Sequence, residues 1–79
     1  MPSTRDQVHD VIRNVLLRPD LRLTDATTAA DVEGWDSLAH ISILFSLESA
    51  FGIRFADTEM GSIQDVGELV RLVETKTGT

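Results

Sequence analysis

Apolar residues recur every three or four positions in three stretches of the chain, which is the period of an amphipathic helix. The first stretch carries them at Val8, Val11, Ile12, Val15 and Leu16. Thr4 and Gln7 fit a capping box before this stripe. Pro19 ends the stretch, because the residue before a proline disfavours the helical conformation. We therefore predict a helix over about residues 4–17, with His9 off the stripe and in solvent.

The second apolar stretch contains no proline or glycine from Leu38 to Phe51, and Gly52 follows it as a typical C-terminal glycine. This predicts a helix over about residues 37–51. A projection at about 100° per residue groups one broad core face, made of Ala39, His40, Ile43, Leu44, Leu47, Ala50 and Phe51. The opposite face mixes serines with large apolar residues and one acid: Leu38, Ser42, Phe45, Ser46, Glu48 and Ser49.

The third stretch repeats apolar residues at Ile63, Val66, Leu69, Val70 and Val73. Ser62 and Asp65 favour a helix that begins at Ser62. Gly67 inside this helix costs about 1 kcal/mol relative to alanine, so it either allows close helix packing or has no role. Before this helix, Asp57 can cap a short helix near residues 58–61.

A long connection, residues 18–36, separates the first two helices. Loops of this length in small domains are usually functional or pinned by their own apolar residues. The residues that can pin this one are Leu21, Leu23, Val32 and Trp35. The side chains that can cap local turns are Thr24, Asp25, Thr27, Thr28 and Asp31. Three long helices and one short helix predict an all-α fold, with residues 1–79 as a single domain.

The composition limits which classes of partner and site the chain is expected to have. A formal charge of −6 disfavours nucleic acid and anionic membranes and suits basic partner surfaces. The chain contains no cysteine, so any thiol chemistry must come from an added group. The acidic loop lacks the order of an EF-hand calcium loop, and we predict no metal site. No apolar run approaches membrane-spanning length and residues 1–10 hold no apolar signal region, so we expect a cytoplasmic protein.

The candidate chemistry lies in Gly34-Trp35-Asp36-Ser37-Leu38, at the mouth of the second helix. Asp36 stands where an N-cap would be, and Ser37 lies in the first turn, where unpaired N–H groups and the helix dipole would receive a phosphate ester on its hydroxyl. From the local pattern alone, a simple helix-terminus serine is the favoured interpretation. A hydrolase nucleophile assisted by His40 is disfavoured, because the order is Gly-x-x-Ser and not Gly-x-Ser-x-Gly.

These five residues resemble the attachment site of acyl and peptidyl carrier proteins. The resemblance continues through Ile41, Leu44, Leu47, Glu48 and Phe51 and spans roughly Val8 to Val73. It implies a small antiparallel four-helix bundle with a short third helix and a long loop between the first two helices. It further implies that Ser37 carries 4′-phosphopantetheine, taken from coenzyme A, whose terminal thiol holds intermediates as thioesters. Asp36 and Leu38 complete that site, and no residue performs catalysis.

In this family the outer face of the second helix is the recognition surface. The resemblance therefore implies five docking residues, Leu38, Ser42, Phe45, Glu48 and Phe55. Fatty-acid carriers are strongly acidic on this face, whereas Glu48 is the sole acid within this helix. That departure, with Trp35 in the motif, favours a stand-alone acyl or aminoacyl carrier of polyketide, nonribosomal-peptide or antibiotic biosynthesis. A D-alanyl or primary fatty-acid carrier is the alternative, and a small helical adaptor without prosthetic group is the alternative of another class.

The resemblance also implies the partners of a monomeric carrier. They are a phosphopantetheinyl transferase, an adenylating or acyltransferase loading enzyme, and a downstream acyltransferase, ketosynthase or condensation enzyme. Neither nucleic acid nor a membrane is among them.

Overall fold

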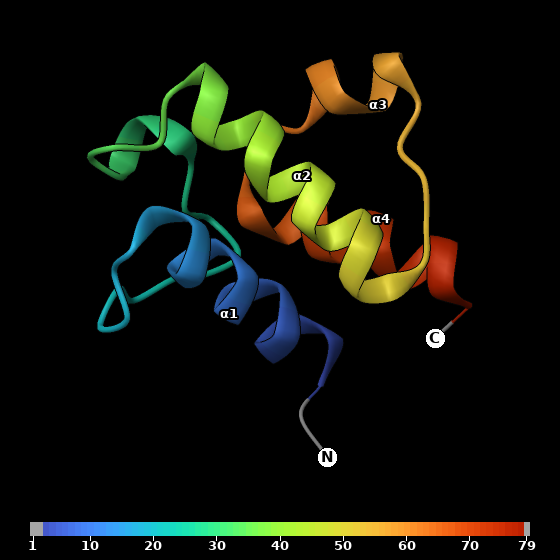
Figure 1. Cartoon of the computed structure of the whole chain (residues 1–79), viewed down its shortest axis with the longest axis horizontal. Coiled ribbons are helices and arrows are strands. Elements are labelled where there is room, and N and C mark those ends of the chain that lie inside the picture. The colour runs from blue at the N-terminus through green and yellow to red at the C-terminus, as the bar shows by residue number, and fades with distance from the viewer. Residues whose placement is uncertain (1–2, 79) are drawn as a thin grey trace.

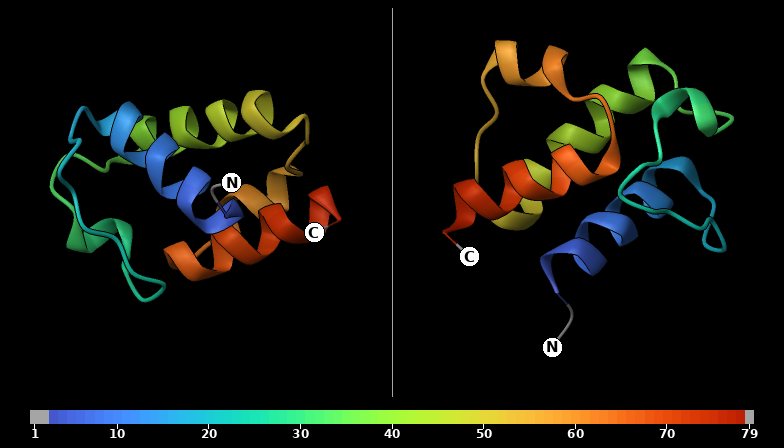
Figure 2. Two further views of the ribbon diagram at one scale, coloured as in Figure 1. Left: turned by 90° about the horizontal axis from the view of Figure 1, so that it is seen from below. Right: turned by 180° about the vertical axis from the view of Figure 1, so that it is seen from behind.

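The computed structural model describes residues 3–78, and four α-helices and one short 3₁₀ helix form in that range. Their bounds are α1 Thr4–Leu16, η1 Ala29–Asp31, α2 Ser37–Phe51, α3 Asp57–Ser62 and α4 Val66–Thr77. The three long helices α1, α2 and α4 pack around one core, while α3 closes the side between α2 and α4 (Figures 1 and 2). The predicted all-helical fold is confirmed, and α2 has the bounds that the sequence predicted.

Helix α1 begins at Thr4, as predicted, but its N-cap is Ser3, one residue before the predicted capping residue. The hydroxyl of Ser3, not that of Thr4, accepts the Asp6 N–H at 3.1 Å. His9 is buried, with 8% of its surface exposed, so its prediction as a solvated residue is wrong. The reason is that α1 contacts both α2 and α4, which buries more of its circumference than one apolar stripe.

The long loop reaches across the molecule and joins the start of α4. The carbonyls of Thr27 and Asp25 accept the N–H groups of Val66 and Gly67, each at 2.9 Å. A Cβ at position 67 would lie 2.9 Å from both the Cβ and the carbonyl oxygen of Asp25, so only glycine admits this approach. Gly67 therefore serves the contact between loop and helix, which neither of its predicted roles included.

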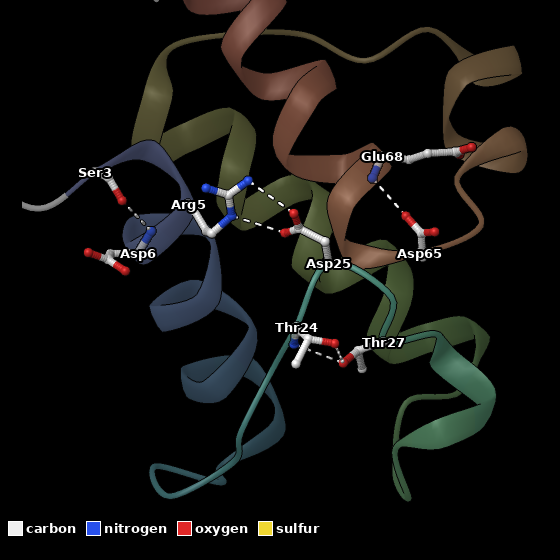
Figure 3. A network of polar contacts seen from close by, with 8 residues as sticks. All are labelled: Ser3, Arg5, Asp6, Thr24, Asp25, Thr27, Asp65 and Glu68. Carbon is white, nitrogen blue, oxygen red and sulfur yellow. Dashed lines mark hydrogen bonds and ion pairs between the residues drawn. The ribbon is translucent and has the colours of Figure 1, made fainter.

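The same segment of the loop is tied to α1. The Arg5 guanidinium donates from Nε and Nη2 to the two carboxylate oxygens of Asp25, at 3.0 and 3.1 Å. Figure 3 shows Asp25 between Arg5 and the first turn of α4, with the Thr24–Thr27 turn beside it. One loop residue thus joins α1 and α4 by its side chain and its backbone.

The start of α4 differs from the prediction. Ser62 ends α3 instead of opening α4, and its hydroxyl donates to the Glu59 carbonyl at 3.2 Å. Asp65 is the N-cap of α4 and accepts the Glu68 N–H at 2.8 Å. The first turn of α3 is closed by Glu59, which accepts the Ala56 N–H at 2.8 Å, whereas Asp57 was predicted as its cap.

The core draws on all three long helices and on the loop. Its buried apolar residues are Val8, Ile12, Val32, Trp35, Ile43, Leu44, Leu47, Phe55, Val66, Leu69, Val70 and Val73. Val32 and Trp35 are buried and Leu21 and Leu23 pack against the core, which confirms that these residues pin the loop. Ala50, predicted on the core face of α2, is exposed in its last turn. None of the helices in residues 3–78 is long and apolar enough to cross a membrane.

Candidate functional site

Ser37 is the first residue of α2 and its side chain is exposed. Asp36 precedes it as the N-cap: its carboxylate accepts the Ala39 N–H at 2.8 Å, and its carbonyl accepts the His40 N–H at 2.9 Å. These two bonds satisfy the third and fourth amides of the helix. The hydroxyl of Ser37 therefore stands in solvent on a rigid helix start, where an attached group displaces nothing from the core.

The first two amides of α2 remain open. Within residues 3–78, no acceptor is bonded to the N–H of Ser37 or to that of Leu38. Both residues are exposed at the positive end of the helix dipole. A phosphate ester on the Ser37 hydroxyl would find two backbone donors and a favourable field.

Trp35 anchors the segment that leads to Ser37. Gly34 turns the chain with a φ of 92°, a conformation that favours glycine, and the Trp35 side chain then enters the core. Its indole Nε1 lies 3.2 Å from Nδ1 of His40, and the other ring nitrogen of His40 lies 3.3 Å from the Met60 carbonyl. Both nitrogens of His40 are thus engaged away from Ser37, so the ring does not activate that hydroxyl as a hydrolase base would.

A groove of about 610 Å³ opens beside Ser37. Its lining combines α2, α3 and the end of the loop: Ala29, Trp35, Asp36, Ser37, His40, Ile41, Leu44, Met60, Gly61 and Ile63. Apolar side chains form most of this wall. The site therefore joins an exposed hydroxyl, two open amides and an apolar groove.

The outer face of α2 carries several exposed apolar side chains. Leu38 and Phe45 expose 77% and 57% of their surface, and Ser42 between them is also exposed. Ile41 is exposed too, although it was predicted neither on the core face nor as a docking residue. We call Leu38, Ile41, Ser42 and Phe45 the docking strip.

Two other predicted docking residues have structural contacts. Phe55 exposes only 6% of its surface, and the Lys76 ammonium lies 5.8 Å from its ring centroid. Its prediction as a docking residue is wrong, because the link after α2 turns this ring into the core. Glu48 is half-buried, and its carboxylate accepts the Phe55 N–H at 2.8 Å, so it stabilises this link.

The remaining ionisable contacts hold elements together away from Ser37. Lys76 of α4 pairs with Glu59 of α3 at 2.8 Å, and this hydrogen bond, helped by the Ala56 N–H, lowers the pKa of Glu59. Among the described residues, no group of three or more His, Asp or Glu is placed to hold a metal ion. The chemistry of the site thus rests on the hydroxyl and amides at the start of α2.

Comparison with known proteins places this geometry in a family context. The family model described as "Phosphopantetheine attachment site" matches residues 6–73, which include Ser37 and the whole docking strip. The solution NMR structure of holo acyl carrier protein from Geobacter metallireducens superposes with a TM-score of 0.89 at 37% identity, over 99% of this chain and 88% of that one.

Three curated relatives are also named acyl carrier proteins. An acyl carrier protein of Thermotoga maritima is 24% identical over 96% of this chain and 99% of its own length. The chloroplastic acyl carrier protein 2 of Hordeum vulgare is 32% identical and that of Arabidopsis thaliana 34%, over 96% and 92% of this chain. The chain spans 59% and 54% of those two plant proteins.

Proposed function

Because the chain belongs to the phosphopantetheine attachment site family of carrier proteins, we propose that it tethers biosynthetic intermediates as thioesters on an arm attached at Ser37. The protein is a carrier and not an enzyme, and its prosthetic group is 4′-phosphopantetheine. When bound, this group supplies the thiol that a chain without cysteine lacks. The observation that carries the assignment to Ser37 is its exposed hydroxyl beside two open amides.

The residues around Ser37 suit a phosphodiester. The N–H groups of Ser37 and Leu38 are available to its anionic oxygens, and the Asp36 carboxylate is already directed at the Ala39 N–H. That bond fixes the carboxylate at the helix start, where the helix dipole stabilises its charge. The tether then raises the effective concentration of a bound intermediate at each partner's active site.

The docking strip suits partners that recognise shape and apolar surface. Exposed apolar groups beside a functional residue mark interfaces, and three of them follow Ser37 on one side of α2. The partners we propose are a phosphopantetheinyl transferase, a loading enzyme of the adenylating or acyltransferase class, and a downstream acyltransferase, ketosynthase or condensation enzyme. Basic residues around an apolar centre would speed the encounter of a partner with a carrier of net charge −6.

For the pathway, we propose specialised biosynthesis of the polyketide or nonribosomal-peptide type. The support is the charge of α2, whose single acid Glu48 is bonded to the Phe55 N–H and so contributes little to a docking face. The alternative is a primary fatty-acid or D-alanyl carrier. The mass of the thioester released from protein isolated from its native host would decide between them.

We further propose that the protein works as a cytoplasmic monomer. A cysteine-free chain needs no oxidising compartment, and a net charge of −6 opposes both self-association and binding to anionic membrane surfaces.

Intact mass after incubation with coenzyme A and a phosphopantetheinyl transferase tests the assignment to Ser37. We expect the wild type to gain the mass of one arm, Ser37→Ala to gain none, and the control Ser49→Ala, which removes an exposed serine of α2 outside the docking strip, to gain it as the wild type does. Unchanged thermal unfolding of Ser37→Ala would show that the loss is chemical. A Ser37→Ala protein that still gained the arm would disprove the assignment.

A further inference from the structure

The His40 side chain on α2 contacts both the segment that precedes Ser37 and α3 beside the groove. An indole N–H can only donate a hydrogen bond, so Nδ1 of His40, 3.2 Å from Nε1 of Trp35, is the acceptor. The proton of the neutral ring is then on Nε2, which donates to the Met60 carbonyl at 3.3 Å. The sequence of donors and acceptors therefore runs from Trp35 through His40 to Met60, and we call it the clasp.

The position of the clasp gives it a role at the attachment site. Trp35 lies two residues before Ser37, His40 lies one turn after it on α2, and Met60 belongs to α3. All four residues line the same groove. On its other side, α3 is held to α4 by the ion pair of Glu59 with Lys76. The clasp thus connects α3 by hydrogen bonds to the end of α2 that bears Ser37.

We propose that His40 is a positioning residue. Its neutral ring couples the segment preceding Ser37 to α3, and this coupling holds α3 in place as one wall of the groove beside the attachment site. Movement of α3 away from α2 breaks the bond to Met60, and through the same ring it loosens Trp35 and the turn that presents Ser37. An apolar contact would weaken gradually with such a movement, whereas hydrogen bonds are lost within a short displacement. The part concerning Ser37 rests on the proposed function, and the coupling itself does not.

The wild-type protein alone provides the first test. Nitrogen-15 NMR of the imidazole ring distinguishes the neutral tautomer with its proton on Nε2 from the one with its proton on Nδ1. We expect His40 to be the Nε2–H tautomer at neutral pH. A ring protonated on Nδ1 would be unable to accept the Trp35 N–H and would overturn the proposal without any variant.

Two variants of His40 then test the coupling on unmodified protein. His40→Phe keeps a ring but removes both hydrogen bonds, and His40→Gln keeps one acceptor and one donor at a similar reach. Trp35 is the only tryptophan in the sequence, so its indole N–H gives a single signal. In His40→Phe we expect solvent exchange of that N–H to rise about fivefold or more, as the loss of one ordinary hydrogen bond implies. The amide signal of Gly61 should also shift, because this amide shares a peptide group with the Met60 carbonyl. His40→Gln should restore both.

His9→Gln is the control, because it removes the other histidine of the sequence, which is buried on α1 away from the clasp. It should leave the indole exchange and the Gly61 signal unchanged. Unchanged indole exchange in His40→Phe, or the same change in His9→Gln, would overturn the coupling.

The rate of arm transfer tests the consequence at Ser37. We expect kcat/KM of the transferase to fall about fivefold for His40→Phe and to recover for His40→Gln at equal thermal stability. Equal rates for all variants would overturn the positioning role while the attachment at Ser37 stands. Failure of the wild type to accept the arm would instead refute the proposed function, and the tautomer and exchange measurements would still decide the coupling.

Discussion

The starts of α2 and α4 have the same capping chemistry and differ in what covers them. In each helix an aspartate N-cap accepts the third amide at 2.8 Å, from Ala39 to Asp36 and from Glu68 to Asp65. The first two amides of α4 are bonded to loop carbonyls at 2.9 Å, whereas those of α2 have no acceptor among residues 3–78. The closed start stabilises the fold, and the open start is available to a ligand.

This difference depends on the second residue of each helix and on a loop segment that is distant from α4 in the sequence. The loop can reach α4 because residue 67 is glycine and because Arg5 of α1 holds Asp25 in place. The corresponding residue of α2 is Leu38, whose side chain points into solvent and contributes to the docking strip. An identical local cap thus has two outcomes, decided by the second residue of each helix and by the loop that meets it.

The largest expected effect is a difference in stability between a variant of the core and a variant of the docking strip. Phe55→Ala should lower the free energy of unfolding by about 3–5 kcal/mol, because it removes a buried ring from beneath Lys76. Phe45→Ser, on the docking strip, should change it by less than about 0.5 kcal/mol while slowing acyl transfer by a partner enzyme. Chemical denaturation and a transfer assay measure the two effects. A large loss of stability for Phe45→Ser would place that side chain in the core and refute the docking strip.

The next effect tests the closed start directly. Gly67→Ala should cost about 2 kcal/mol, because the added methyl group would push Asp25 away and weaken the two hydrogen bonds from the loop, against a gain of about 1 kcal/mol in helix propensity. Gly61→Ala is the matched control, since its Cβ would meet nothing within 4 Å and its stability should be unchanged or improved. Hydrogen exchange at Val66 should accelerate in Gly67→Ala only. Equal stability of both variants would mean that the loop yields without cost.

Several contacts that the sequence did not predict join segments that meet only in the folded chain. The bounds of α2 could be predicted, because Asp36 and Gly52 act on the helix that they flank. The start of α4 was misplaced because Ser62 and Asp65 are both good caps, and only the bonds to Thr27 and Asp25 select the second. The bond of Glu48 to the Phe55 backbone and the role of Gly67 likewise depend on the folded loop and link. Ser37 was predictable because its neighbours in sequence are its neighbours in space.

Acidification should have a smaller effect on the free energy of unfolding, through His9 on α1. Burial lowers the pKa of His9, and the nearby Arg13 and Arg5 lower it further. The unfolded chain therefore binds a proton at about pH 6.5 that the folded protein resists, so stability should fall as the pH drops through this value and level off below the folded pKa. The pKa values of Asp25 and Glu59 are lowered from the usual carboxyl range, so their contributions are lost only at more acidic pH.

His9→Gln isolates this contribution. Its unfolding free energy should vary less between about pH 7.5 and pH 5.5 than that of the wild type, as measured by urea denaturation. The difference between the two proteins removes the contribution of any other histidine. Parallel pH profiles for both proteins would show that His9 is not the group responsible.

The smallest expected effect is that of salt on docking to the open side. The exposed surface of the docking strip is apolar apart from Ser42, and Glu48 is bonded to the Phe55 backbone. Charge steering acts mainly on association rates and is screened beyond about 10 Å at 0.1 M salt. The affinity of the arm-bearing protein for its loading enzyme should therefore change by less than about threefold between about 0.05 and 0.5 M salt.

Variants of the open side make the salt measurement decisive. Ser42→Glu adds an acid in the middle of the docking strip, so it should introduce a salt dependence that the wild type lacks. A steep fall in wild-type affinity would instead mean that acids outside α2 dominate recognition. We consider four acids of the segments that flank α2, namely Asp31, Glu33, Asp57 and Glu59. Asp31 accepts the Thr28 N–H and Glu59 pairs with Lys76, so exposed Glu33 and Asp57 are the candidates. If Glu33→Gln and Asp57→Asn together abolished the salt dependence, apolar docking on α2 would be wrong, and the partner would bind the ends of the segments that flank this helix.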